Sequence, residues 1–172
     1  RLGRVSHLRA QGCGQALYWR SIEAFGTFDF VWDSASLNGS QFIGCADTGI
    51  KHWESYTPAS QVYGLDFDGC NSFQVDVLTF GDSATGALVR IKGGDFGRIN
   101  QIRASGRPGI ATPTITGVLL EGVSSVNIND VQTFRCAKGI HVKGGGSNGI
   151  EVLSHRSLTT DVNPLCIESG AP

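Results

Sequence analysis

The amino-acid sequence predicts an all-β fold in which the chain coils as a single-stranded right-handed parallel β-helix, a solenoid of about seven turns. A short strand motif recurs along the chain, a second strand follows each copy, and clusters of Gly, Asn, Ser and Asp lie between the strands. The 172 residues include 24 Gly, 40% are hydrophobic and no Gly-X-Y period occurs. We therefore expect one packed domain over residues 1–172.

The first strand of each turn begins with Gly or Pro and then alternates inward apolar residues with outward residues, the last of them charged. Its copies GLDFD, GALVRIK, GVLLEG, GIHVKG and PLCIES start at Gly64, Gly86, Gly117, Gly139 and Pro164, so successive starts lie 22, 31, 22 and 25 residues apart. Alternation with a period of two is typical of β-strands, and recurrence at this spacing is typical of stacked turns. A β-sandwich also contains many short strands, but it gives no reason for Gly and a charge to recur at fixed offsets.

A second strand follows each first strand. These strands are FQVDVL, GRINQI, VNINDV and IEVLSH, which start at Phe73, Gly97, Val126 and Ile150. The repeat already begins at residue 2 and stops in mid-repeat, so we expect a segment of a longer coil, or a coil closed by another chain. The alternation predicts inward columns made of Leu65, Phe67, Ala87, Val89, Ile91, Val118, Leu120, Ile140, Val142, Leu165 and Ile167 from the first strands and Val75, Ile99, Ile128 and Val152 from the second.

Composition argues against several classes of partner. The formal net charge is −1 and Lys and Arg form no run, which disfavours nucleic acid and anionic membrane surfaces. No apolar stretch is long enough to span a bilayer, so no membrane insertion is expected. The five Cys follow neither a disulfide nor a metal spacing, and the four His form no metal-binding motif. We expect reduced cysteines, no metal and no cofactor.

The outward charged positions are the first candidates for function. The last outward position of the first strands reads Asp68, Arg90, Glu121, Lys143 and Glu168, alternating in sign from turn to turn. One interpretation is a ladder of ion pairs between turns. The other is a groove that binds sugar hydroxyls and acidic groups through the same side chains. Its catalytic candidates are Asp66, Asp68 and Glu121, because two carboxylates roughly 6.6 Å apart along one strand suit glycoside hydrolysis.

A neighbouring outward column reads Asp66, Leu88, Leu119, His141 and Cys166. Exposed leucines on consecutive turns, Leu88 and Leu119, predict a face covered by another subunit. The candidate substrate-binding residues of the groove are Arg90, Lys92, His141 and Lys143.

Two insertions interrupt the repeat, ESYTPASQVY over 54–63 and ASGRPGIATPTIT over 104–116. Loops on a rigid scaffold often carry binding groups. Trp53, Tyr56 and Tyr63 are candidate binding residues whose rings would stack on sugar rings, and Glu54 is a further candidate catalytic acid. The alternative is that these aromatic side chains pack the first insertion onto the coil.

The segment GCNSFQVDVLTFG over 69–81, the segment ITGVLLEGVSSVNINDVQTFRCAKGIHVKGGGSNGIEV over 115–152 and the irregular turns resemble the β-helix of bacteriophage tailspikes and related pectin-lyase-like proteins. Arg90, Ile91 and Lys92 are also similar to a substrate-binding triplet of polygalacturonases, whose catalytic motifs are absent here. The resemblance implies a homotrimer on a virion tail, assembled in the host cytoplasm. Such a protein binds a bacterial surface polysaccharide, capsule or O-antigen, and depolymerises it as a glycosidase or lyase. The alternatives are a non-catalytic receptor-binding module and a structural stalk segment of a phage tail fibre or spike.

Overall fold

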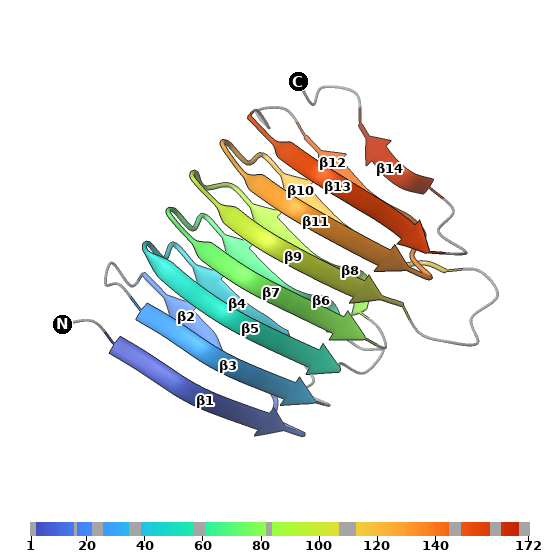
Figure 1. Cartoon of the computed structure of the whole chain (residues 1–172). Coiled ribbons are helices and arrows are strands. Elements are labelled where there is room, and N and C mark those ends of the chain that lie inside the picture. The colour runs from blue at the N-terminus through green and yellow to red at the C-terminus, as the bar shows by residue number, and fades with distance from the viewer. Residues whose placement is uncertain are drawn as a thin grey trace.

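The computed structural model describes residues 3–15, 17–21, 26–34, 39–56, 61–81, 84–106, 113–144, 149–158 and 163–168. Every regular element in these ranges is a β-strand, and the strands form two parallel seven-stranded sheets (Figure 1). Each strand pairs with the strand two places further along the sequence. The chain therefore alternates between the two sheets as it climbs, which is the parallel β-solenoid that the sequence predicts.

We name the two sheets by the numbers of their strands. The odd sheet, in front in Figure 1, contains β1 (Gly3–Gln11), β3 (Gly26–Ser34), β5 (Thr48–Tyr56), β7 (Gln74–Gly81), β9 (Arg98–Ser105), β11 (Asn127–Phe134) and β13 (Glu151–Leu158). The even sheet contains β2 (Tyr18–Arg20), β4 (Ser40–Ile43), β6 (Gln61–Asp68), β8 (Ala84–Lys92), β10 (Thr116–Glu121), β12 (Lys138–Lys143) and β14 (Asn163–Ile167). Nothing in the described ranges forms a helix long and apolar enough to cross a membrane.

Apolar columns fill the space between the two sheets. In the odd sheet Phe28, Ile50 and Val75 stand in register on successive turns and are at most 2% exposed. In the even sheet the rings of Phe42 and Phe67 stack with their centroids 5.2 Å apart. The predicted inward residues that the structure buries are Leu65, Phe67, Val75, Ala87, Val89, Ile91, Ile99, Val118, Leu120, Ile128 and Ile140. Similar side chains thus stack on one another and form one continuous core.

The coil has about five turns rather than the seven expected. Its buried core runs from Phe28 in β3 to Ile140 in β12, and the first and last strands of each sheet only flank it. Leu165 and Ile167 of β14, predicted to face inward, are 58% and 59% exposed. The reason is that, among the described strands, β14 pairs with β12 alone, so the described residues place a neighbouring turn on only one side of it.

Glycine sets one of the close approaches between turns. Gly94 lies in the left-handed region with φ of +85°, and a Cβ there would run into the backbone carbonyl of Cys70. Only glycine fits both the dihedral and the contact. The buried Cys70 thiol donates to the carbonyl of Phe42 over 3.1 Å, and no disulfide links the five cysteines, all of which lie in the described ranges.

The register of β8 differs from the expectation by two residues. Asp66 pairs with Arg90 and Asp68 with Lys92, whereas the sequence motif set Arg90 beside Asp68. The charged row that forms is Asp68, Lys92, Glu121 and Lys143. The expected exposed leucine face is also wrong, because Leu88 is 0% exposed and belongs to the core, while Leu119 is half-buried between Arg90 and His141.

Candidate functional site

The outer face of the even sheet carries a buried ion pair. The Arg90 guanidinium donates from Nε to Oδ1 of Asp66 over 2.7 Å and from Nη2 to Oδ2 over 2.6 Å. Its Cζ lies 4.0 Å from the centre of the Tyr63 ring, and Asp66 is 1% exposed. Burial lowers the pKa of Arg90, but its hydrogen bonds to Asp66 and the charge of Asp66 outweigh burial, so that pKa is raised. The predicted catalytic Asp66 is therefore closed to a substrate in this arrangement.

The other predicted groove residues continue along the same face. Asp68 lies 3.4 Å from Arg90 and 3.5 Å from Lys92, and Glu121 stands in register between Lys92 and Lys143. The structure thus brings Asp66, Asp68, Arg90, Lys92 and Tyr63 together, with Glu121 and Lys143 following in register. The opposite charges neutralise one another, which corresponds to the ladder interpretation.

His141 belongs to a separate cluster at the far end of the even sheet. Its side chain is 8% exposed, and Nε2 lies 2.7 Å from Oε1 of Glu168. The ammonium of Lys138 is 3.2 Å from the same ring nitrogen. These contacts tie β12 to the residue that follows β14.

Trp53 does not line a surface site. It is 0% exposed, stands in register between Val31 and Leu78, and meets the Phe42 ring edge-on with centroids 5.9 Å apart. The sequence placed the start of an insertion directly after it, but β5 continues as a strand through Tyr56 and so turns Trp53 inward. Of the two predicted insertions, 57–60 and 107–112 lie outside the described residues.

Glu54 and Tyr56 lie instead on the outer face of the odd sheet. The Tyr56 hydroxyl donates to Oε1 of Glu54 over 2.6 Å, and Nε2 of His52 is 4.0 Å from Oε2. Tyr56 is 42% exposed, and its ring lies against Gly81, where a Cβ would stand 3.1 Å from two ring carbons. Because Gly81 has no side chain, the Tyr56 ring can lie close to the sheet. The hydrogen bond from Tyr56 holds the Glu54 carboxylate, whose side chain is still partly exposed to solvent.

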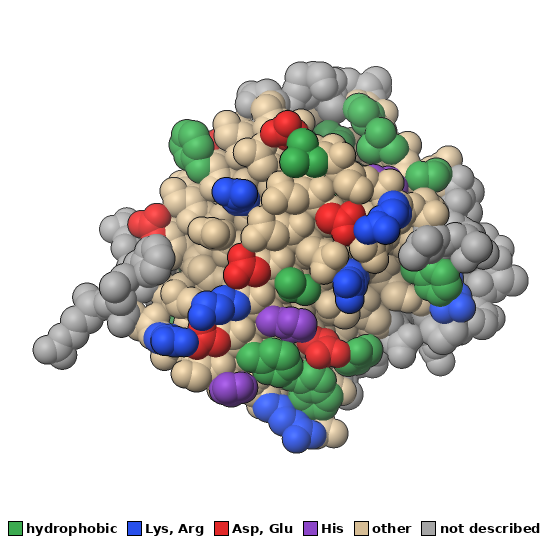
Figure 2. All heavy atoms as spheres, viewed as in Figure 1, with side chains coloured by type: hydrophobic (Ala, Val, Ile, Leu, Met, Phe, Trp, Pro, Cys, Tyr) green, Lys and Arg blue, Asp and Glu red, His purple; other side chains and the backbone are tan. Residues whose placement is uncertain are grey.

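An aromatic patch adjoins Glu54; we define it as His7, Arg9, Phe30, Trp32 and His52. The Phe30 ring lies between the two histidine rings, with centroid distances of 6.0 Å to His7 and 5.2 Å to His52. The Arg9 guanidinium lies over Trp32, 4.6 Å from the ring centre. Figure 2 shows hydrophobic and histidine side chains gathered over the lower strands of this face, with charged groups beside them. A surface hollow opens among His7, Leu8, Arg9, Phe30 and Trp32.

One row of side chains links this patch to the rest of the odd sheet. In register across successive turns it reads Arg9, Trp32, Glu54, Thr79, Arg103, Gln132 and Arg156. Beyond Glu54 a second hollow of about 290 Å³ lies over Gly81, between Tyr56 and Phe134, with Arg103 beside it. The row therefore combines aromatic faces with hydrogen-bonding and charged groups along the coil.

The sequence did not point to Phe30, Trp32 or His52. Over 26–34 the apolar residues Phe28, Phe30 and Trp32 recur at every second position, which predicts that they share one face. The strand instead buries Phe28 and Val31 with two successive outer residues between them, and this break in the alternation places Phe30 and Trp32 on the outer face. Within the described ranges, no three His, Cys, Asp or Glu side chains gather closely enough to hold a metal ion.

No protein-family model, curated protein or solved structure matches this chain. What supports a function is therefore the chemistry of the odd-sheet face itself.

Proposed function

We propose that the outer face of the odd sheet binds a bacterial surface polysaccharide, capsule or O-antigen, and that the coil is the receptor-binding part of a trimeric phage tailspike on the virion tail. The observation that carries the binding proposal is the aromatic patch beside Glu54 and Tyr56, where partly exposed rings lie next to charged groups. The trimer and the virion rest on the resemblance in sequence.

Sugar rings present an apolar face and a rim of hydroxyl groups. A ligand of this kind needs flat apolar partners and directed hydrogen-bonding groups in alternation. Phe30, Trp32 and Tyr56 supply rings from three register rows, while Arg9 and Glu54 supply a donor and an acceptor within the row of Trp32. A protein surface would also use Trp, Tyr and Arg, which makes subunit contact the competing use of this face.

Binding is favoured over cleavage by the placement of the carboxylates. Glycoside hydrolysis needs a second carboxyl group about 5–10 Å from the first. The carboxylate of Asp29, on the neighbouring strand β3, is held by Arg4 at 2.6 Å and Lys51 at 2.8 Å. Asp66 and Asp68 lie on the even sheet. Of the predicted catalytic residues, Glu54 is the one that lies on this face, and cleavage is the second candidate function.

Binding is tested with the full chain on immobilised capsular and O-antigen polysaccharides. We expect Trp32→Ala and Tyr56→Ala each to weaken binding roughly tenfold, because each removes a ring from the surface. Tyr18→Ala is the matched control, since Tyr18 is a 50% exposed aromatic residue on the even sheet. Unchanged binding by both odd-sheet variants, or an equal loss with Tyr18→Ala, would contradict the proposal.

Cleavage is measured on the same polysaccharides by the length of the polymer before and after incubation. Shorter products that disappear with Glu54→Gln would assign catalysis to this face. Binding with unchanged polymer length would leave a receptor-binding module. If the chain neither binds nor cleaves these polysaccharides and sediments as a trimer in analytical ultracentrifugation, the coil would be a structural stalk.

A further inference from the structure

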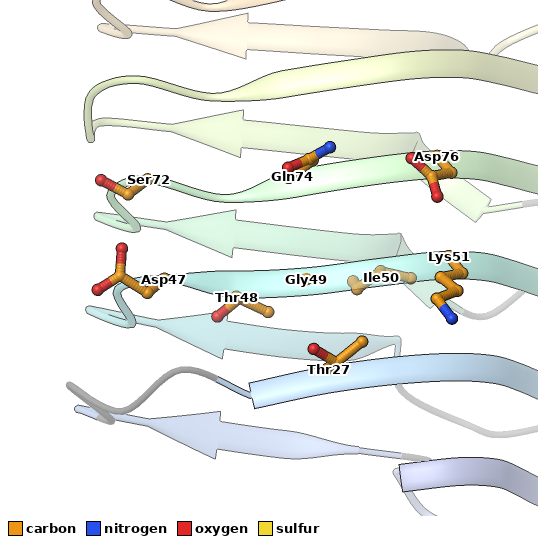
Figure 3. Close-up of a pocket in the computed structure, with 9 residues that line it drawn as sticks. All are labelled: Thr27, Asp47, Thr48, Gly49, Ile50, Lys51, Ser72, Gln74 and Asp76. Carbon is orange, nitrogen blue, oxygen red and sulfur yellow. The ribbon is translucent and has the colours of Figure 1, made fainter. Parts of the chain in front are cut away.

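A single glycine opens a polar hollow on the outer face of the odd sheet. The outward row at this position reads Arg4, Thr27, Gly49, Gln74, Arg98 and Asn127 in register. Each of the other members carries a polar side chain, so Gly49 leaves a gap over β5. The gap forms a hollow of about 230 Å³ (Figure 3).

Polar residues of β3, β5 and β7 line this hollow. Figure 3 shows Thr27 on β3 and Gln74 on β7 flanking Gly49, with Lys51 and Asp76 toward one end of the strand. Asp47 and Ser72 close the other end, at the turns that lead into β5 and toward β7. Hydroxyl, amide and carboxylate groups thus line the edge of a space that no side chain of β5 fills.

Two charged groups of the rim, those of Lys51 and Asp76, are already held in position, and so is the turn that carries Asp47. Lys51 turns toward Asp29, with Nζ 2.8 Å from Oδ1, so its charge is directed to β3. Oδ1 of Asp76 accepts from Nδ2 of Asn100 over 2.9 Å, on the side away from the hollow. Asp47 donates its backbone N–H to the carbonyl of Asn71 over 3.1 Å, which fixes the turn. A rim whose members are held in this way loses little conformational freedom when a ligand binds.

We propose that the Gly49 hollow is a subsite for one uncharged or amino-bearing sugar unit and that it rejects a uronic acid. This inference rests on the proposed polysaccharide binding and names the kind of sugar unit at one end of the site. Asp47 and Asp76 place two carboxylates at the rim, and Lys51, the one cation among the lining residues, is paired with Asp29. An additional carboxylate would be repelled, whereas hydroxyl and amino groups would donate to Asp47 and Asp76.

Size and position agree with this assignment. The hollow is smaller than the ~300–1,000 Å³ of pockets for drug-sized ligands, so it suits a single ring. His52 of the aromatic patch lies three residues further along β5, which corresponds to about 10 Å of strand. The hollow therefore lies close enough to the patch for one polysaccharide to contact both.

The test titrates the full chain with methyl glucoside, glucosamine and glucuronate and follows the backbone amide signals of Gly49 and Gln74 by NMR. We expect these signals to shift with the first two sugars and not with glucuronate at the same concentration. Gly49→Phe should weaken glucosamine binding roughly tenfold by filling the hollow. Gly49→Ala serves as the milder variant, because its Cβ would stand 3.5 Å from Oγ1 of Thr27, an ordinary contact.

Gly3→Ala is the matched control, since a Cβ at Gly3 meets nothing within 4 Å. If Gly49→Phe does not fold, judged by far-UV circular dichroism, Gln74→Ala takes its place. Equal shifts with glucuronate, or full glucosamine binding by the variants, would overturn the subsite while polysaccharide binding at Trp32 could still stand. Shifts at Gly49 together with no polysaccharide binding would instead refute the proposed function and keep the hollow as a monosaccharide site.

Discussion

Arg90 on β8 holds both carboxylate oxygens of Asp66 on β6 across one turn of the coil, with N–O distances of 2.7 and 2.6 Å. The pair is nearly enclosed, because the Arg90 side chain is 12% exposed and that of Asp66 1%. Such a pair fixes which residues of successive turns lie side by side, since a shifted register would leave a buried charge alone.

Arg90→Met tests this pair. The substitution leaves the Asp66 carboxylate buried without its partner, which costs about 3–5 kcal/mol of the free energy of unfolding. Lys92→Met is the control, because the Lys92 side chain is 46% exposed and 3.5 Å from Asp68, so its loss should cost about 1 kcal/mol or less. Urea denaturation measures both. Equal urea midpoints for the two variants would show that the Asp66–Arg90 pair stabilises the fold no more than the exposed Asp68–Lys92 pair does.

Trp53→Ala should act on stability and not on recognition. Removing a fully buried indole from between Val31 and Leu78 leaves a cavity and costs about 3–5 kcal/mol. The folded fraction should bind polysaccharide as the unmodified chain does, because the Trp53 ring does not reach the surface. Thermal unfolding and binding are measured on the same sample. If Trp53→Ala were as stable as the unmodified chain but no longer bound polysaccharide, Trp53 would be a binding residue and not a core residue.

The cysteines should divide into two classes by reactivity. Burial raises the pKa of the Cys70 thiol to about 12, and Cys45 and Cys136 are equally enclosed. Because the thiolate of Cys70 is the reactive form and all three thiols are shielded from the reagent, these three should resist iodoacetamide at pH 8 in the folded protein. Cys13 and Cys166 are partly exposed and should be alkylated first. Mass spectrometry before and after unfolding gives the positions; rapid labelling of Cys70 in the folded state would be inconsistent with its burial.

Asp29 should make stability depend on acidity. Hydrogen bonds from Lys51 and then Arg4 hold the pKa of Asp29 below its ordinary value of 3.8. A carboxyl group whose pKa is lowered by folding stabilises the fold above its unfolded pKa, and this contribution disappears as the pH falls through the folded pKa. The unmodified chain should therefore melt above Asp29→Asn at pH 7, and the two should converge by about pH 2.

The same comparison in salt provides the control for Asp29. Both ion pairs are near the surface, so about 1 M NaCl should narrow the difference between the two melting temperatures at pH 7. If the two melting temperatures still differ at low pH, Asp29→Asn destabilises the fold for a reason other than the loss of charge.

Much of the coil could be predicted because strand alternation and turn glycines are local signals. The inward columns through Val75 and Leu120 follow from a period of two. The partner of Arg90 was predicted wrongly. The motif set Gly86 beside Gly64, and therefore Ala87 beside Leu65, whereas the structure pairs Leu65 with Val89. A slip of two residues keeps every side chain on its face and changes only its neighbour, so alternation alone cannot detect it.

The candidate site was predicted only in part for a related reason. Glu54 and Tyr56 were identified, but Trp53 was assigned to the surface because Pro58 and its neighbours marked an insertion. Whether β5 ends before or after Tyr56 depends on its pairing with β3 and β7, which are remote contacts. Trp32 and His52 come together with Glu54 through the same pairing.

The row from Arg9 through Trp32 and Glu54 to Arg103 has a consequence for the length scale of recognition. Its side chains recur once per turn, at the spacing of about 4.8 Å between parallel strands. A polymer lying along the coil can meet each of them only where its own repeat length is commensurate with that spacing. Two glycans of the same sugar composition but different linkage would then be told apart by their pitch, without any change in the groups that touch the protein.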